Sequence, residues 1–183
     1  MPVKKINWTS IKKQLQAQEP KDTLNLLGEL YKLNRENKQF LDTRFSSSKE
    51  VLKVYIEAIR DALDPPLNRD MEVDFKSARK VISNYKKARK DDIEGIAELM
   101  LCFVENANDF TLSYGDMWEQ FYINIETMYE KVIVEVTKME RMGIDIGPLQ
   151  ERLREVMSST SDIGWGYHDT LADLYFTAFE KES

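Results

Sequence analysis

The sequence has few of the residues that interrupt regular structure or build disulfides and metal sites. Only 7 glycines and 5 prolines occur among 183 residues, which favours long regular elements over loops. The single cysteine, Cys102, excludes an internal disulfide framework and leaves no cysteine cluster for zinc. A lone thiol is typical of a protein kept in a reducing cytosol.

Long hydrophobic runs are also missing. No uninterrupted apolar stretch approaches the roughly 20 residues that a membrane-spanning helix needs. Residues 1–8 include Lys4 and Lys5 but no apolar run follows them, so we expect no signal peptide. We therefore expect a soluble, cytoplasmic protein, and one domain of this length buries enough surface to fold without metals or disulfides.

Recognised catalytic motifs are absent from the sequence. It has no Gly-rich phosphate-binding loop and no G-x-S-x-G turn for a nucleophilic serine. Any Ser–His–Asp or Cys–His arrangement would have to use the only histidine, His168. Cys102 stands between Leu101 and Phe103, which is typical of a buried small residue rather than a nucleophile. We expect no cofactor and no metal, and we favour a non-enzymatic function.

Charge is distributed unevenly along the chain. Residues 1–90 hold 20 Lys/Arg and 12 Asp/Glu, a net charge of +8, whereas residues 91–183 hold 6 and 20, a net charge of −14. The sign changes between Lys76–Lys90, which has seven basic and no acidic residues, and Asp91–Asp116, where every charged residue is acidic. Such a dipole can steer partners, pair the two halves or drive self-association.

Apolar residues recur at helical spacing along nearly the whole chain, which predicts an all-α protein of about nine helices with no strand. The helices are expected to begin at Thr9 or Ser10, Pro20, Asn34, Ser47 or Ser48, Asp74, Asp91–Asp92, Asp116, Gly147 and Gly164. The helix from Asp116 should be the longest, run to about Met142 and be stopped by Gly143.

Two interruptions divide this pattern. Residues 64–73 include Pro65 and Pro66 and read as a linker, and Asn106–Gly115 reads as a turn region. We expect a single domain over residues 1–183 with a sub-boundary at the 64–73 linker. Consecutive antiparallel helix pairs would form a bundle or a short curved stack.

The basic helix, residues 76–90, carries the clearest interaction signal. Its density of positive charge would suit a phosphate-binding face, although a pI near 5.0 is unusual for a nucleic-acid binder. We favour the alternative that this helix pairs with the acidic segment after residue 90. Its candidate interaction residues are Lys76, Arg79, Lys80, Lys86, Lys87, Arg89 and Lys90.

Two turns combine Gly, Asp and aromatic residues just before a predicted helix, and loops on a rigid scaffold commonly carry function. They are residues 108–116 and residues 164–169. The alternative, which we favour, is that Tyr114 and Trp165 fold back onto the core. The candidate pocket residues are Glu105, Tyr114, Asp116, Trp165, His168 and Asp169.

A metal-dependent hydrolase remains a weaker alternative. Asp169 and Asp173 share a helix face near His168, and Glu98 and Glu105 share a face seven residues apart. Neither set has a recognised ligand spacing, so exposed acidic faces are the favoured interpretation.

The chain resembles a family of uncharacterised, mostly bacterial, all-helical proteins known only as a domain of unknown function. The resemblance covers about two thirds of the chain and rests on residues 29–33, 36–41, 82–88, 97–100, 103–105, 114–116 and 121–122. It implies a cytoplasmic helical fold and assigns no activity, catalytic residue or binding residue.

The sequence thus favours a protein-interaction or scaffold module that binds an unknown protein partner. A nucleic-acid-associated accessory protein that uses the basic helix is the alternative. No membrane association is expected. The charge dipole and the apolar stripe of the longest helix leave both a monomer and a homodimer open, and we favour the monomer.

Overall fold

The computed structural model of the chain describes residues 6–64 and 73–180, which form an all-α fold without a strand in either range. The predicted fold class is therefore confirmed. None of the helices in the described ranges combines the length and the apolarity needed to cross a bilayer. The nine helices described are α1 (Trp8–Gln16), α2 (Pro20–Leu33), α3 (Arg35–Phe45), α4 (Ser48–Leu63), α5 (Phe75–Ala88), α6 (Ile93–Tyr114), α7 (Glu119–Arg141), α8 (Gly147–Ser158) and α9 (Tyr167–Phe179).

Several helix ends lie where the sequence predicts them, because the expected capping residues act as caps. The side chain of Asp74 accepts a hydrogen bond from the Ser77 amide, and that of Asp92 accepts one from the Gly95 amide, both at 2.9 Å. Gly143 follows α7 with a positive φ of 74°. The first helix differs from the prediction, since its cap is Asn7 rather than Thr9 or Ser10.

The prediction of a turn over Asn106–Gly115 is wrong, because α6 continues to Tyr114. Both asparagine side chains of this segment find hydrogen-bond partners within the helical arrangement. Asn106 donates to the Cys102 carbonyl at 2.7 Å, and the buried Asn108 donates to Ser159 Oγ at 3.0 Å. The helix ends at Gly115, whose φ of 95° is reserved in practice for glycine.

The following helix starts later than expected. Asp116 does not open it; residues 115–118 form the connection, and α7 begins at Glu119. The hydroxyl of Tyr122 holds this connection, because it donates to Asp116 Oδ1 at 2.5 Å and accepts from the Met117 amide at 2.9 Å. The same hydroxyl lies 2.9 Å from Thr111 Oγ1 near the end of α6. Tyr122 therefore joins the end of α6, the connection and the start of α7.

The chain divides after Phe45 into two compact units, unit 1 (residues 1–45) and unit 2 (residues 46–183). The sequence predicts a sub-boundary at residues 64–73, and most of this segment, residues 65–72, lies outside the described residues. The helices before and after it, α4 and α5, pack on each other within unit 2.

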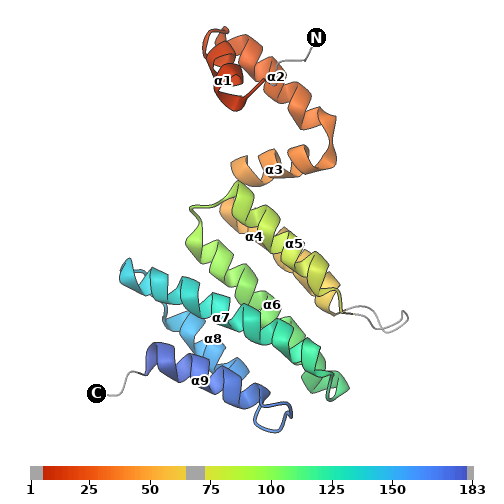
Figure 1. Cartoon of the computed structure of the whole chain (residues 1–183), viewed down its shortest axis with the longest axis vertical. Helices are drawn as coiled ribbons and strands as arrows, with labels where there is room; N and C mark the ends of the chain where they lie inside the picture. Colours follow the sequence, from red (N-terminus) through yellow and green to blue (C-terminus); the bar gives the residue numbers. More distant parts are fainter. Residues whose placement is uncertain (1–5, 65–72, 181–183) are drawn as a thin grey trace. The chain divides into compact units, whose positions relative to one another are not determined.

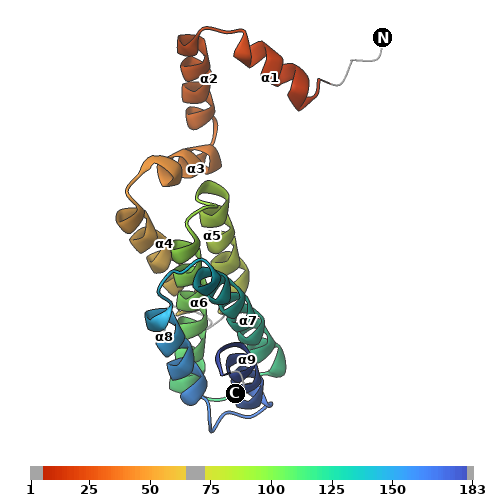
Figure 2. The same ribbon diagram turned by 90° about the vertical axis from the view of Figure 1, so that its left-hand side faces the viewer.

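Unit 2 is a stack of three helical hairpins. Figure 1 shows α4 with α5, then α6 with α7, then α8 with α9, and neighbouring hairpins pack on each other. The helix α6 contacts α4, α5, α7 and α8, and 13 of its 22 residues are buried. In the perpendicular view, α4 and α8 lie on the same side of α6 (Figure 2).

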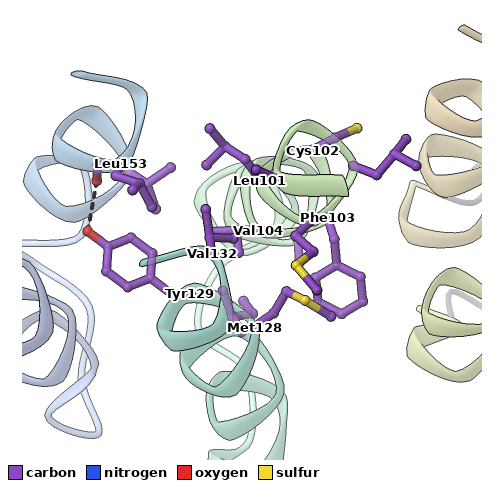
Figure 3. Packing of buried hydrophobic residues seen from close by; sticks show 14 of the residues in the cluster. Leu101, Cys102, Phe103, Val104, Met128, Tyr129, Val132 and Leu153 are labelled. Atoms are coloured by element: carbon purple, nitrogen blue, oxygen red, sulfur yellow. Dashed lines mark hydrogen bonds between the residues drawn. The ribbon is translucent and has the colours of Figure 1, made fainter. Parts of the chain in front are cut away.

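The core of unit 2 is continuous from α4 to α9, with its centre between α6 and α7. Val104, Met128 and Val132 meet between these two helices, and Tyr129 reaches from α7 to α8, where its hydroxyl donates to the Leu153 carbonyl at 3.0 Å (Figure 3). Cys102 is buried within α6, as expected, and burial raises the pKa of its thiol to about 11. A thiol with this pKa is almost entirely protonated at neutral pH and hence a poor nucleophile.

Unit 1 is held together mainly between α2 and α3. Tyr31 donates to Asp42 Oδ1 at 2.9 Å, and the Asn37 side chain donates to the Leu30 carbonyl at 2.9 Å. The Asn34 side chain accepts from the Asn37 amide at 2.8 Å, which confirms Asn34 as the cap of α3. By contrast, α1 and α2, both fully described, contain no buried residue.

The cap of α5 generates a prediction about pH. Hydrogen bonds from Ser77 hold the pKa of Asp74 below its usual value. A lowered folded-state pKa adds stability above the unfolded-state pKa, and this stability is lost as pH falls through the folded-state value. We expect Asp74→Ala to lower the free energy of unfolding by about 1 kcal/mol near neutral pH, and the deficit to shrink below roughly pH 4.

Urea unfolding of the full chain at several pH values measures how the stability lost in Asp74→Ala depends on pH. Asp74→Asn is the matched control, because asparagine keeps an oxygen acceptor for the Ser77 amide without a titrating charge. A deficit for Asp74→Ala that stays constant down to pH 2 would contradict the assignment of the ionised cap.

Candidate functional site

A hollow of about 670 Å³ in unit 2 is lined mainly by residues of α4, α6 and α8. This volume is within the range of ligand-binding pockets. We call it the Arg152 pocket. Its lining residues are Ser48, Lys49, Leu52, Ile56, Tyr85, Asp92, Glu94, Gly95, Glu98, Met139, Ile144, Asp145, Pro148, Leu149 and Arg152.

One wall of the Arg152 pocket is a tightly packed corner between the end of α5 and the start of α6. The hydroxyl of the fully buried Tyr85 donates to Asp92 Oδ2 at 2.6 Å, while Asp92 Oδ1 caps α6 through the Gly95 amide. Burial, followed by the contact with Asp92, raises the pKa of Tyr85. A Cβ atom at Gly95 would lie only 2.6 Å from the Tyr85 hydroxyl oxygen, so this corner requires glycine.

Arg152 and Glu98, which also line the pocket, belong to a three-residue ion cluster with Glu105. Arg152 of α8 binds Glu105 through two parallel hydrogen bonds of 2.7 Å, and its third nitrogen donates to Glu98 at 2.6 Å. Both carboxylates project from α6. Their hydrogen bonds, that to Glu105 foremost, raise the pKa of Arg152 despite its partial burial. Bidentate pairing of this kind fixes the guanidinium in one orientation.

Arg152 also borders a second, smaller hollow of about 360 Å³. Its lining is more polar and includes Arg60, Asp109 and Ser159. Arg152 therefore stands between an apolar hollow and a polar one.

The Arg152 pocket combines an apolar floor with a net negative charge. Leu52, Ile56, Met139, Ile144 and Leu149 supply the apolar floor. Four carboxylates line the pocket against two cationic side chains. Such a surface can accept an apolar group that carries positive charge beside it.

The lining contains the hydroxyl of Ser48 and neither a histidine nor a cysteine. Within residues 6–64 and 73–180, no group of three His, Cys, Asp or Glu side chains is placed to hold a metal ion.

The predicted pocket residues lie in three separate surroundings. Glu105 binds Arg152 and lines the smaller hollow. Asp116 binds Tyr122, and its Oδ2 would lie 3.8 Å from a Cβ at Gly164, so the two Gly-containing loops do approach each other. His168 Nδ1 lies 3.1 Å from Thr160 Oγ1 and from the Met157 carbonyl, whereas Asp169 is exposed in the first turn of α9.

The expectation that Tyr114 and Trp165 fold back onto the core is wrong. Tyr114 is 40% exposed although its ring packs on Phe110, and Trp165 is 58% exposed. Trp165 has a φ of 65° and precedes Gly166 at 69°, so two consecutive left-handed residues turn its side chain outward at the start of α9.

Several cationic side chains of the basic helix bind groups elsewhere in unit 2. Arg79 donates to Asn124 Oδ1 at 2.6 Å and lies over the Phe103 ring, and Lys86 forms an ion pair with Glu135 at 3.1 Å. Arg89 donates to Ser48 Oγ at 2.8 Å and to the Ser46 carbonyl. The exposed lysines of the basic helix also include Lys76, Lys80, Lys87 and Lys90.

Arg152 is the site residue that sequence reasoning missed. The interpretation of Glu98 and Glu105 as an exposed acidic face is wrong, because both carboxylates are partly buried and bind Arg152. The chain separation of about fifty residues hid this pairing.

Unit 1 carries the second candidate site, a set of exposed apolar side chains. Ten large apolar residues are exposed among the 40 described residues of unit 1, against nine among the 127 described residues of unit 2. We call them the exposed apolar set: Ile6, Trp8, Ile11, Leu24, Leu26, Leu27, Leu30, Leu33, Phe40 and Phe45. Concentrations of this kind mark interaction surfaces, whereas isolated exposed apolar residues do not.

Comparison with known proteins gives no match for this chain among protein-family models, curated proteins or solved structures. The features of the chain that bear on its function are therefore the exposed apolar set and the Arg152 pocket.

The Tyr85–Asp92–Gly95 corner generates a stability prediction. Gly95→Ala should lower the free energy of unfolding by about 1–3 kcal/mol, because the new methyl group meets the buried Tyr85 hydroxyl and cannot be accommodated without displacement. Gly28→Ala is the matched control, since nothing lies within 4 Å of its Cβ position and alanine is the better helix former. Chemical denaturation checks both variants, and an unchanged or raised stability for Gly95→Ala would contradict the tight corner.

The ion cluster generates a second prediction. Arg152→Met should cost about 1–3 kcal/mol in unfolding free energy, because two partly buried carboxylates then face each other without a cation. Arg154→Met, at an exposed position on the same helix, should change stability by less than about 0.5 kcal/mol. Equal effects of the two substitutions in denaturant titrations would show that the cluster does not stabilise unit 2.

Proposed function

We propose that the protein is a non-enzymatic, cytoplasmic helical interaction module in which unit 2 is a rigid scaffold and unit 1 supplies the binding surface. The observation that carries this proposal is the exposed apolar set of unit 1. Exposed apolar surface of this extent is unfavourable in water, and a partner that covers it offsets this cost.

The helix α1 gives the proposal its physical basis. It has nine residues, and isolated helices shorter than about 12–15 residues are marginal in water. Within unit 1, α2 packs on α3, whereas α1 packs closely on neither. Its apolar residues Trp8, Ile11 and Leu15 follow an i, i+3, i+7 spacing, which is the pattern of a helix that lies in an apolar groove of a partner.

A nucleic-acid-associated function has weaker support. It would use the basic helix, where Arg79, Lys86 and Arg89 already bind groups of unit 2. The remaining exposed lysines leave a smaller phosphate-binding surface than the sequence alone suggests.

A variant of α2 tests the proposed function. Leu24→Ser/Leu27→Ser/Leu33→Ser should reduce recovery of bound protein from a native extract by at least about tenfold, because it removes three exposed apolar side chains. Val54→Ser/Val134→Ser is the matched control, since both valines are exposed but belong to unit 2. Circular dichroism verifies that both variants keep their helices.

Equal recovery of bound proteins by the α2 variant and by the wild type would reject the role of the exposed apolar set. Loss in the valine control as well would show that the effect is not specific to unit 1.

A further inference from the structure

The helix α1 and the Arg152 pocket are complementary in both charge and apolar character. The charges of α1 are Lys12 and Lys13, with no acidic residue. At 100° per residue Lys12 lies beside the apolar stripe, whereas Lys13 lies on the opposite side of the helix. The pocket offers an apolar floor and an excess of carboxylates. The two units as a whole carry the same relation, since unit 1 has a net charge of +4 and unit 2 of −10.

We propose that the partner of α1 is a second copy of this chain, which receives α1 in its own Arg152 pocket. This inference rests on the proposed function, because it names the occupant that covers part of the exposed apolar set. Opposite charges favour unit 1 against unit 2 of another molecule, whereas two unit 1 surfaces would bring two net positive charges together.

Trp8 and Ile11 are the side chains that would enter the pocket. They are 67% and 38% exposed, and one turn of helix separates them so that both point to the same side. Tryptophan is enriched among the residues that dominate binding energy at interfaces. The floor residues of the pocket, such as Leu52 and Leu149, match them in apolar character.

Lys12 of α1 would then meet the acidic rim of the pocket. Glu94 is exposed in the first turn of α6, and Asp145 is exposed just before α8, where it accepts one hydrogen bond from the Gly147 amide. Asp92 binds Tyr85 and Glu98 binds Arg152, so the exposed Glu94 and Asp145 are the carboxylates best placed to receive Lys12.

The exchange is reciprocal in a dimer with two-fold symmetry. Each copy donates its α1 and offers its pocket, so the same contact forms twice and the assembly closes. This symmetry permits a charge-swap experiment in which two altered chains restore each other.

The experiment uses the full chain and two variants. Variant A is Lys12→Glu/Lys13→Glu, which makes α1 acidic. Variant B is Glu94→Lys/Asp145→Asn, which makes the pocket rim basic while the asparagine oxygen can still accept from the Gly147 amide, as Asp145 does at 3.0 Å. Lys21→Glu/Lys32→Glu is the matched control, because it applies the same charge change to α2.

Sedimentation at low salt measures the dimer dissociation constant of each protein. The wild type and the α2 control should dimerise, and variants A and B should each dissociate at least about tenfold more readily. A mixture of A and B should regain dimers, because the acidic α1 then meets the basic rim and the unaltered α1 of B meets the unaltered pocket of A. Trp8→Ala should weaken the wild-type dimer at high salt too, where the charge contribution is screened.

The inference is wrong if the wild type stays monomeric up to roughly 100 µM, which corresponds to very weak affinity. It is also wrong if variants A and B dimerise as well as the wild type. It is wrong, too, if a mixture of A and B does not regain dimers. A monomeric wild type whose α2 variant still loses a bound protein would remove the second copy as partner and leave the proposed function in place. Thermal unfolding of A and B separates lost association from lost folding.

Discussion

The structure of unit 2 depends on the burial of α6 on nearly all sides. A helix with 13 buried residues of 22 can keep polar side chains only where other elements supply hydrogen bonds. Arg152 satisfies Glu98 and Glu105, Ser159 and Tyr167 satisfy Asn108, and the Tyr122 hydroxyl lies against Thr111. The partners lie on α7, on α8, at the residue that caps the end of α8, and on α9, so the polar residues of α6 fix the positions of the helices that follow it.

The sequence predicts most of the helices because its local signals are strong. Asp74, Asp92 and Gly143 act at the predicted helix ends, and their effects need no distant partner. The prediction of a turn at residues 106–115 failed because asparagine is common in turns. In the structure these asparagines lie in a helix, where Asn106 binds the nearby Cys102 carbonyl and Asn108 binds Ser159, about fifty residues further along the chain. The Arg152 pocket could not be predicted, since it requires α4, α6 and α8 to meet and no local pattern specifies that arrangement.

The two units differ in how much of their apolar surface they bury. Unit 2 covers its apolar residues with its own helices and keeps its exposed ones scattered over a long segment. Unit 1 has three helices and little internal core, and the amphipathic α1 and α2 contain no buried residue. The uneven charge of the chain follows the same division, so the more basic unit is also the one with uncovered apolar side chains.

All three tryptophans of the chain are more than half exposed, whereas Tyr85, Tyr122, Tyr129 and Tyr167 are fully or almost fully buried. The two kinds of aromatic chromophore therefore report on different events. Tryptophan emission shifts to shorter wavelength when a surface bearing Trp8, Trp118 or Trp165 is covered. Near-ultraviolet circular dichroism of the tyrosines follows the packing around α6 and α7 instead. The chain thus carries separate intrinsic optical signals for association and for folding.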